Sequence, residues 1–214
     1  MKVLVIGSHG KVGKRLIKKL KKHHHEVLAM IRDESQTEEI EKTGAKAIVA
    51  DLEKDFGFAY GDHLDAVVFT AGSGGHTGKD KTIAVDLQGA KKSIDEAVRH
   101  KVSRYIMVSA LGADDPMNIP GNLQHYFVAK AEADEHLAQT QLNYTIFRPG
   151  TLTDEAGIGS IQAAEKLQSY NSRDTRRDDL AEAIAVSIDK PNTYKKVIEL
   201  VNGNTPVNEA IKSI

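Results

Sequence analysis

Short apolar runs alternate with segments of helical apolar spacing along the chain. Residues 3–6 form an apolar run that is too short for a helix and borders a glycine, which predicts a buried parallel strand. In residues 11–22, the apolar positions Val12, Leu16, Ile17 and Leu20 follow helical spacing, which predicts a helix. Residues 27–31 repeat the strand pattern, so the chain opens with a strand, a helix and a second strand.

The same alternation continues to residue 201 and defines the expected fold. Further strands are predicted at residues 45–50, 65–71, 105–108, 143–147 and 196–201, and helices at 38–43, 79–101, 124–140 and 178–189. The helix at 79–101 is expected to bury one face, which consists of Ile83, Leu87, Ala90, Ile94, Ala97 and Val98. Residues 113–122 are predicted to form a loop, and residues 151–177 give mixed signals without an assignment. This order predicts an α/β fold with a doubly wound parallel sheet and helices on both faces.

Composition narrows the class of protein. A length of 214 residues with 40% hydrophobic content suits one domain, 1–214, with a small C-terminal substrate region. We expect its substrate cleft to be built largely from residues 110–122 and 150–180. The net charge of −1 gives no pull toward nucleic acid or an anionic membrane. No run is long enough to span a membrane and the chain starts directly on a strand, so a cytoplasmic protein is expected. The oligomeric state is left open.

Thiolate and metal chemistry are not expected. The chain has no cysteine, so no disulfide forms and no thiolate is available. The consecutive residues His23, His24 and His25 do not share a helix face, and no carboxylate cluster accompanies them. We therefore expect a solvated loop at these histidines and no metal site.

A glycine-rich turn joins the first predicted strand to the first predicted helix. Gly7, Gly10 and Gly13 follow one another at a spacing of three, in the pattern G-x-x-G-x-x-G. Glycines there let a pyrophosphate approach the backbone and the unpaired N–H groups at the helix start. The sequence therefore predicts that a dinucleotide binds at Gly7, Ser8, His9, Gly10, Lys11, Val12 and Gly13.

The end of the second predicted strand indicates which dinucleotide binds. An acidic residue at this place accepts hydrogen bonds from the ribose of NAD, whereas an arginine meets the 2′-phosphate of NADP. Here Arg32 follows the strand, and Asp33 comes one residue later, where capping of a helix is its plain role. We predict NADP in preference to NAD, with a solvated surface charge as the alternative for Arg32.

Later strand ends supply further candidate contacts to the cofactor. Asp51 and Leu52 follow the third predicted strand, and Asp51 either meets the adenine amino group or caps the next turn. Small residues after the fourth strand, Ala71 and Gly72, let the backbone approach the cofactor, and the stretch continues through Ser73, Gly74 and Gly75. The alternative for this stretch is a flexible loop.

A tyrosine and a lysine four residues apart are the candidates for proton transfer. Tyr126 and Lys130 lie on one face of the predicted helix at 124–140. A phenol donates a proton to a carbonyl oxygen as hydride arrives, and a nearby ammonium lowers its pKa. Ser109, at the end of the fifth strand, is placed to orient the same oxygen. The alternative is an ordinary exposed helical pair.

Together these motifs resemble the short-chain dehydrogenase/reductase superfamily, in its atypical branch of small NAD(P)H-binding proteins of the NmrA-like and biliverdin/flavin reductase types. The resemblance covers nearly the whole chain. It implies a Rossmann-type sheet and catalytic roles for Ser109, Tyr126 and Lys130, with Lys130 also holding the nicotinamide ribose. It also implies that Arg148, Pro149 and Gly150, after the sixth strand, lie beside the nicotinamide.

The expected function is that of an NADP-dependent oxidoreductase that transfers hydride between nicotinamide and a small carbonyl, flavin or quinone substrate. The alternative is an NADP(H)-binding redox sensor without turnover. An epimerase or dehydratase is less expected, because such enzymes usually have a longer C-terminal half. One departure bears on catalysis: Ser109 and Tyr126 are separated by seventeen positions, more than is usual in the superfamily.

Overall fold

A mostly parallel sheet forms the centre of the computed structural model, which describes residues 1–74, 77–119 and 121–214. The described strands have the order β11-β8-β10-β6-β5-β4-β1-β2-β3. Seven of them are mutually parallel: β1 (Lys2–Ile6), β2 (Glu26–Ile31), β3 (Lys46–Val49), β4 (Ala66–Phe69), β5 (Arg104–Val108), β6 (Asn143–Pro149) and β10 (Lys196–Asn202). This arrangement confirms the predicted α/β fold of Rossmann type. Two positions of the predicted loops, Gly75 and Pro120, lie outside the described residues.

The segment 151–177, which the sequence left unassigned, forms short strands. β8 (Ser160–Ala164) pairs antiparallel with β10, and β11 (Thr205–Pro206) pairs with β8, so this edge of the sheet is not parallel. β7 (Thr151–Thr153) and β9 (Asp174–Arg176) form a separate parallel pair. Strands this short have little periodicity, and their partners lie far away in the chain, so the local pattern does not reveal them.

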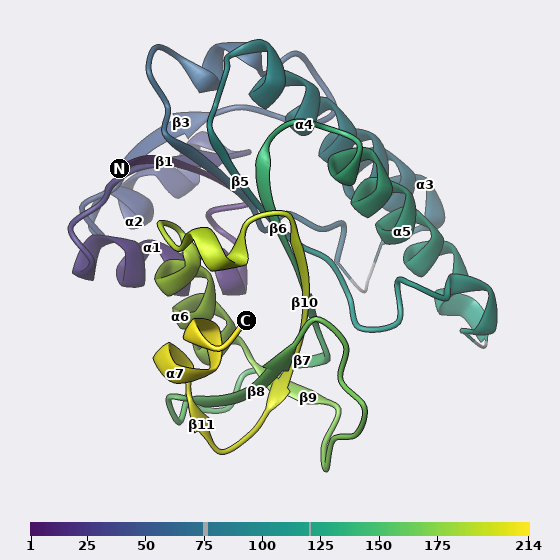
Figure 1. The fold of residues 1–214 in the computed structure, drawn as a ribbon. Coiled ribbons are helices and arrows are strands. Elements are labelled where there is room, and N and C mark those ends of the chain that lie inside the picture. Colours follow the sequence, from purple (N-terminus) through teal and green to yellow (C-terminus); the bar gives the residue numbers. More distant parts are fainter. Residues whose placement is uncertain (75–76, 120) are drawn as a thin grey trace.

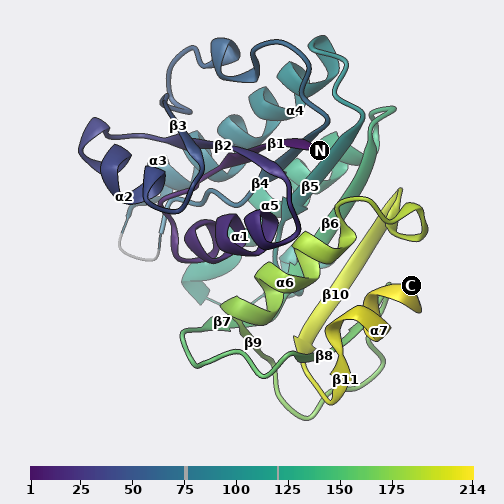
Figure 2. The same ribbon diagram turned by 90° about the vertical axis from the view of Figure 1, so that its left-hand side faces the viewer.

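Helices cover both faces of the sheet (Figure 1). α1 (Lys11–Lys22), α6 (Arg177–Ser187) and α7 (Val207–Lys212) lie on one face, with α2 (Thr37–Glu41) near its edge. α4 (Ala90–Arg99) and α5 (Gln124–Ala138) lie on the other face. Figure 2 shows α1 and α6 side by side in front of the strands, in agreement with their extensive packing.

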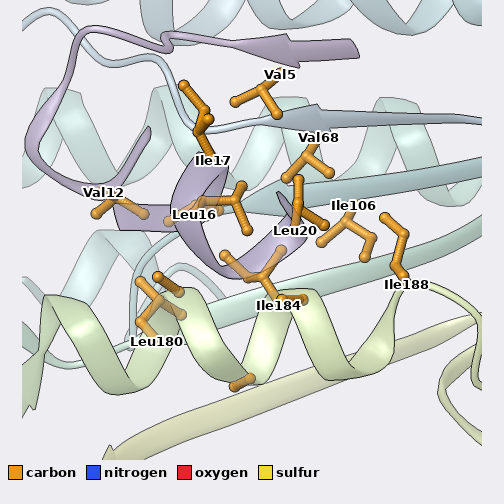
Figure 3. Close-up of a cluster of buried hydrophobic side chains, with 14 of the residues drawn as sticks. Val5, Val12, Leu16, Ile17, Leu20, Val68, Ile106, Leu180, Ile184 and Ile188 are labelled. Carbon is orange, nitrogen blue, oxygen red and sulfur yellow. The ribbon is translucent and has the colours of Figure 1, made fainter. Parts of the chain in front are cut away.

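Each face buries its own apolar cluster. Between α1, α6 and the sheet, the buried apolar side chains include Val5, Leu16, Leu20, Ile106 and Ile184 (Figure 3). Their spacing on α1 is the helical periodicity seen in the sequence, and burying each such side chain contributes about 1.5–3 kcal/mol. The core therefore fixes where α1 begins, and this start faces the carboxyl end of the sheet.

The predicted helix at 79–101 contains a π-helical stretch. α3 (Lys79–Lys81) leads into η3 (Thr82–Gly89), which is π-helical, and α4 follows directly. The expectation that Ile83 and Val98 are buried is wrong, because each is 49% exposed. Asp86, in contrast, is 1% exposed. A π-helix makes i→i+5 hydrogen bonds, so its inward face no longer follows the 3.6-residue period. The change of period carries a carboxylate into the protein interior.

Candidate cofactor and active site

Glycines bring the end of β1 against the end of β4. Gly7 has φ +84°, and a Cβ added to it would lie 2.6 Å from the backbone nitrogen of Ala71. A Cβ on Gly13 would lie 2.3 Å from the carbonyl oxygen of Gly7, and one on Gly10 would lie 3.1 Å from that oxygen. The turn therefore packs backbone against backbone, which only glycine permits. It lies at the carboxyl ends of the neighbouring strands β1 and β4, between which the strand order reverses, and such sheets bind ligands at this point.

The start of α1 presents free amide groups at this turn. Its N-cap is Gly10, no side chain caps the helix, and its first turn holds no acidic residue. An uncapped helix N-terminus of this kind binds phosphate groups. Ser8 does not add a donor, because its N–H donates to Met30 (3.2 Å) and its hydroxyl to Val5 (2.7 Å). The cradle fits a diphosphate held by helix amides.

The charged side chains near the cradle are largely paired within the protein. His9 and Lys14 both contact Glu39 at 2.8 Å, and these contacts lower the pKa of Glu39. Lys11 is paired with Asp154, from the segment that follows β7. Val12 is buried and packs in the core. The backbone of residues 7–13 therefore offers more to a phosphate than the side chains do.

Arg32 lies exposed directly after β2. In the described part of the chain, its side chain has no hydrogen bond or ion pair. The carboxylate of Asp33 accepts from the Ser35 N–H at 2.9 Å and caps η1 (Glu34–Gln36), which lowers the pKa of Asp33. The acidic side chain at this strand end is thus engaged in capping, and the guanidinium beside it is available.

Two further predicted contacts lie at neighbouring strand ends. Asp51 accepts a hydrogen bond from the Glu53 N–H at 3.0 Å, so it caps the turn that follows β3. Leu52 is buried and lies against Gly89 at the end of η3. The backbone of Ala71 closes on Gly7, as described above.

Lys130 connects α5 to the end of β5. Its ammonium donates to the carbonyl oxygen of Val108 at 3.3 Å and lies 5.7 Å from the centre of the Tyr126 ring. Ser109, which follows Val108 in the chain, is buried, and its hydroxyl donates to the Asp134 carboxylate at 2.9 Å. The three predicted catalytic residues thus gather around one strand end, although the Ser109 hydroxyl is engaged elsewhere. No Ser109–Tyr126 hydrogen bond is present among the described residues.

Two buried carboxylates, which the sequence analysis missed, complete the cluster. Asp86 lies 3.1 Å from the Lys130 ammonium and also accepts from the Ser73 N–H at 3.0 Å. Asp134 accepts from Ser109 and from the Nε of Arg148, both at 2.9 Å. Asp134 has a sequence signal, because it lies four residues after Lys130 on the same helix face. Asp86 has none, since its burial depends on the π-helical stretch.

The cluster shifts the pKa of several of its members. Burial raises the pKa of the Tyr126 phenol; Lys130 opposes this shift, whereas the two carboxylates add to it. Burial alone would lower the pKa of Lys130, but contact with Tyr126 and Asp86 outweighs it and raises that pKa. Burial likewise raises the pKa of Asp134, against the influence of Arg148 and Ser109. The arrangement therefore favours a protonated phenol.

The segment after β6 packs tightly against the rest of the site. Arg148 and Pro149 belong to β6, which extends two residues beyond its predicted end. A Cβ on Gly150 would lie 1.8 Å from the carbonyl oxygen of Arg173, so this position admits only glycine. Asp154 forms ion pairs with Lys11 and Arg177, and the pair with Lys11 links this segment to the start of α1.

A surface hollow lies well away from these residues. It measures about 770 Å³ and lies at the ends of α4 and α5, beside the starts of β5 and β6. Its lining includes Val98, Ser103 and Leu142, and none of the predicted site residues among the described ones borders it.

No helix in the described part of the chain is long and apolar enough to cross a membrane.

The fold and the glycine turn after β1 define an α/β protein of Rossmann type, a class whose members bind dinucleotides at this turn. The sequence signature of the NAD(P)H-binding family matches residues 7–191, which is most of the chain. The chain belongs to this NAD(P)H-binding family. The expected relation to the atypical dehydrogenase/reductase branch is confirmed at the level of family and fold.

Similar proteins carry two kinds of name. The uncharacterized sugar epimerase YhfK of Bacillus subtilis is 42% identical over the full length of both chains. A Bacillus halodurans structure, provisionally described as an NAD-dependent epimerase/dehydratase, is 44% identical with a TM-score of 0.96 and full coverage of both chains. The oxidoreductase ylbE of Lactococcus lactis is 30% identical with a TM-score of 0.87, over 100% of this chain and 96% of that one.

Proposed function

We propose that the protein is an NADP-dependent reductase that transfers hydride to a small carbonyl compound. The contact between Lys130 and the Val108 carbonyl carries this proposal, because it brings the Tyr126–Lys130 helix to the strand end that bears Ser109. The glycine cradle at the start of α1 supports a dinucleotide beside it. We propose that the substrate lies over the segments 110–119 and 150–180 of the described chain.

The roles of the residues follow from their surroundings. Bound NADPH supplies the hydride, which goes to the carbonyl carbon. Tyr126 donates its phenolic proton to the carbonyl oxygen, so that C=O becomes CH–OH, and the phenolate then takes a proton from solvent. Ser109 orients the substrate oxygen once its hydroxyl rotates away from Asp134. Lys130 binds the ribose hydroxyls, as the superfamily resemblance implies.

NADP is proposed as the cofactor in preference to NAD. Arg32 is exposed and its guanidinium has no partner in the described chain, while Asp33 is engaged in capping η1. A guanidinium binds a phosphate through charge-assisted hydrogen bonds. Arg32→Asp is expected to reduce the preference for NADPH over NADH at least about tenfold, because such a bond contributes about 1.5–3 kcal/mol. Arg99→Asp, at an exposed position on α4, is the matched control. An unchanged preference in Arg32→Asp contradicts the assignment.

The test of the reaction is a substrate panel with NADPH, followed by loss of its absorbance. Saturable turnover of carbonyl compounds that falls about 100-fold or more in Tyr126→Phe supports the proposal, since general acid catalysis contributes about 10²–10⁴-fold. Tyr144→Phe is the control, because Tyr144 also lies beside a lysine, 5.3 Å from Lys195, but on the first part of β6. Equal turnover by Tyr126→Phe and wild type contradicts the assigned role.

Two other outcomes identify the alternatives. Turnover of flavins or quinones that is indifferent to Tyr126→Phe indicates direct hydride transfer without a phenolic acid. Tight NADPH binding without turnover of any compound in the panel indicates a redox sensor. The epimerase named among the relatives requires a base that removes a proton, and the carboxylates of Asp86 and Asp134 disfavour a phenolate at Tyr126.

A further inference from the structure

Asp86 joins two parts of the active site from the interior of the protein. One carboxylate oxygen accepts the backbone N–H of Ser73, in the loop after β4, at 3.0 Å. The other oxygen lies 3.1 Å from the ammonium of Lys130 on α5. Both side chains are at most 5% exposed, so the pair is shielded from solvent. Such a pair persists because separating it leaves an uncompensated charge inside the protein.

The pairing changes what Lys130 does to its neighbour. An ammonium without a counterion, 5.7 Å from a phenol, favours the phenolate and prepares the tyrosine to act as a base. With Asp86 in contact, the positive charge is balanced at its source. The phenol of Tyr126 then experiences burial together with a nearly neutral pair.

The other charged groups around α5 do not add an unpaired positive charge near Tyr126. From α5 itself comes Asp134, which is paired with Arg148 of β6. From α4, Lys91 and Asp95 pair with Glu132 and His136 at the outer surface of the two helices. From the η4 side (Pro116–Asn118), Asp115 binds Asn118. The charges that act on Tyr126 are therefore Lys130, Asp86 and Asp134, and Asp134 is in turn balanced by Arg148, so these four charges sum to zero when all are ionised.

We propose that Asp86 is a positioning residue that keeps the resting Tyr126 in its protonated form, ready to donate to the substrate, by holding Lys130 in an internal ion pair. The part of this inference that concerns reduction rests on the proposed function. The pairing and its effect on the phenol stand on the contacts of Asp86, Lys130 and Tyr126 alone.

The test is a pH titration of Tyr126 in the full-length protein labelled with 3-fluorotyrosine and observed by fluorine NMR. The Tyr126 signal is assigned by its loss in Tyr126→Phe, and the exposed Tyr170 serves as the internal reference. In the wild type, Tyr126 is expected to titrate at higher pH than Tyr170. Asp86→Asn is expected to lower the pKa of Tyr126 by about one pH unit or more, because one charge at this range shifts a pKa by about 1–3 units.

Two further variants separate charge from structure. Asp86→Glu keeps the carboxylate and is expected to leave the Tyr126 titration close to that of the wild type. Asp95→Asn removes a carboxylate from α4 that pairs with His136 at the surface, and it is expected to leave Tyr126 unchanged. In carbonyl reduction with NADPH, Asp86→Asn is expected to move the loss of activity at high pH toward lower pH by the same shift.

Either of two results overturns the proposal. One is a wild-type protein in which the pKa of Tyr126 is lower than that of Tyr170. This result refutes the proposal even if Asp86→Asn does not fold. The other is a folded Asp86→Asn protein whose Tyr126 titration is unchanged. Absence of turnover in the wild type, with the expected NMR shifts, refutes the proposed reductase and leaves the effect of Asp86 on Tyr126 intact.

Discussion

Gly7→Ala tests whether the dinucleotide cradle depends on close backbone packing. Two costs act at this position. A non-glycine residue in the left-handed region at φ +84° costs about 1–2 kcal/mol. The added Cβ would also lie 2.6 Å from the nitrogen and 2.7 Å from the Cα of Ala71, and relieving such an overlap against backbone costs about 1–3 kcal/mol. We expect a loss of about 2–5 kcal/mol in the free energy of unfolding.

Gly44→Ala is the matched control for this measurement. Gly44 follows α2 with φ +82°, and a Cβ there would meet only the flexible end of Lys21, at 3.4 Å. The free energy of unfolding of Gly44→Ala should fall by about 1–2 kcal/mol, which is the cost of the left-handed backbone alone. Urea denaturation gives both values, and titration with NADPH should show weaker binding only for Gly7→Ala. Losses in the two variants that agree within about 0.5 kcal/mol refute the close approach of β1 to β4.

Two further predictions concern the charges that stabilise the fold. Arg104 is buried and has no carboxylate partner in the described chain, and burial lowers its pKa to about 10. Its guanidinium donates hydrogen bonds to three backbone carbonyls and two threonine hydroxyls. Arg104→Met should cost about 3 kcal/mol or more in urea denaturation, since those acceptors lose their donor, and a loss below about 1 kcal/mol contradicts this. Burial alone would lower the pKa of Lys19, but its hydrogen bonds to Asp178 and Glu182 raise it. The stabilising contribution of Lys19, about 1 kcal/mol, is therefore present below pH 10.5, as long as both carboxylates stay ionised, and is lost as pH rises through the raised pKa. Lys19→Met should be less stable than wild type between about pH 5 and pH 10.5, and the two should converge in stability above that range.

Sequence alone determined the unit that begins the fold. β1, the glycine turn and α1 are adjacent in the chain, and their signals are local: an apolar run, glycines and helical spacing. The same holds for the alternation that predicted the sheet with helices on both faces, and for the placement of Tyr126 and Lys130 on one face of α5. Each of these signals is a pattern among residues that are close in the chain.

Tertiary structure decided the surroundings of the candidate active site. Asp86 enters the interior because a π-helical stretch changes the period of its helix, and Ser109 turns toward Asp134, twenty-five positions further along. The strands of residues 151–177 exist through pairing with β10 and with each other. These outcomes depend on partners that meet only after folding, whose positions no local pattern encodes. Local spacing therefore predicted the candidate residues for the chemistry, and packing fixed the charges that surround them.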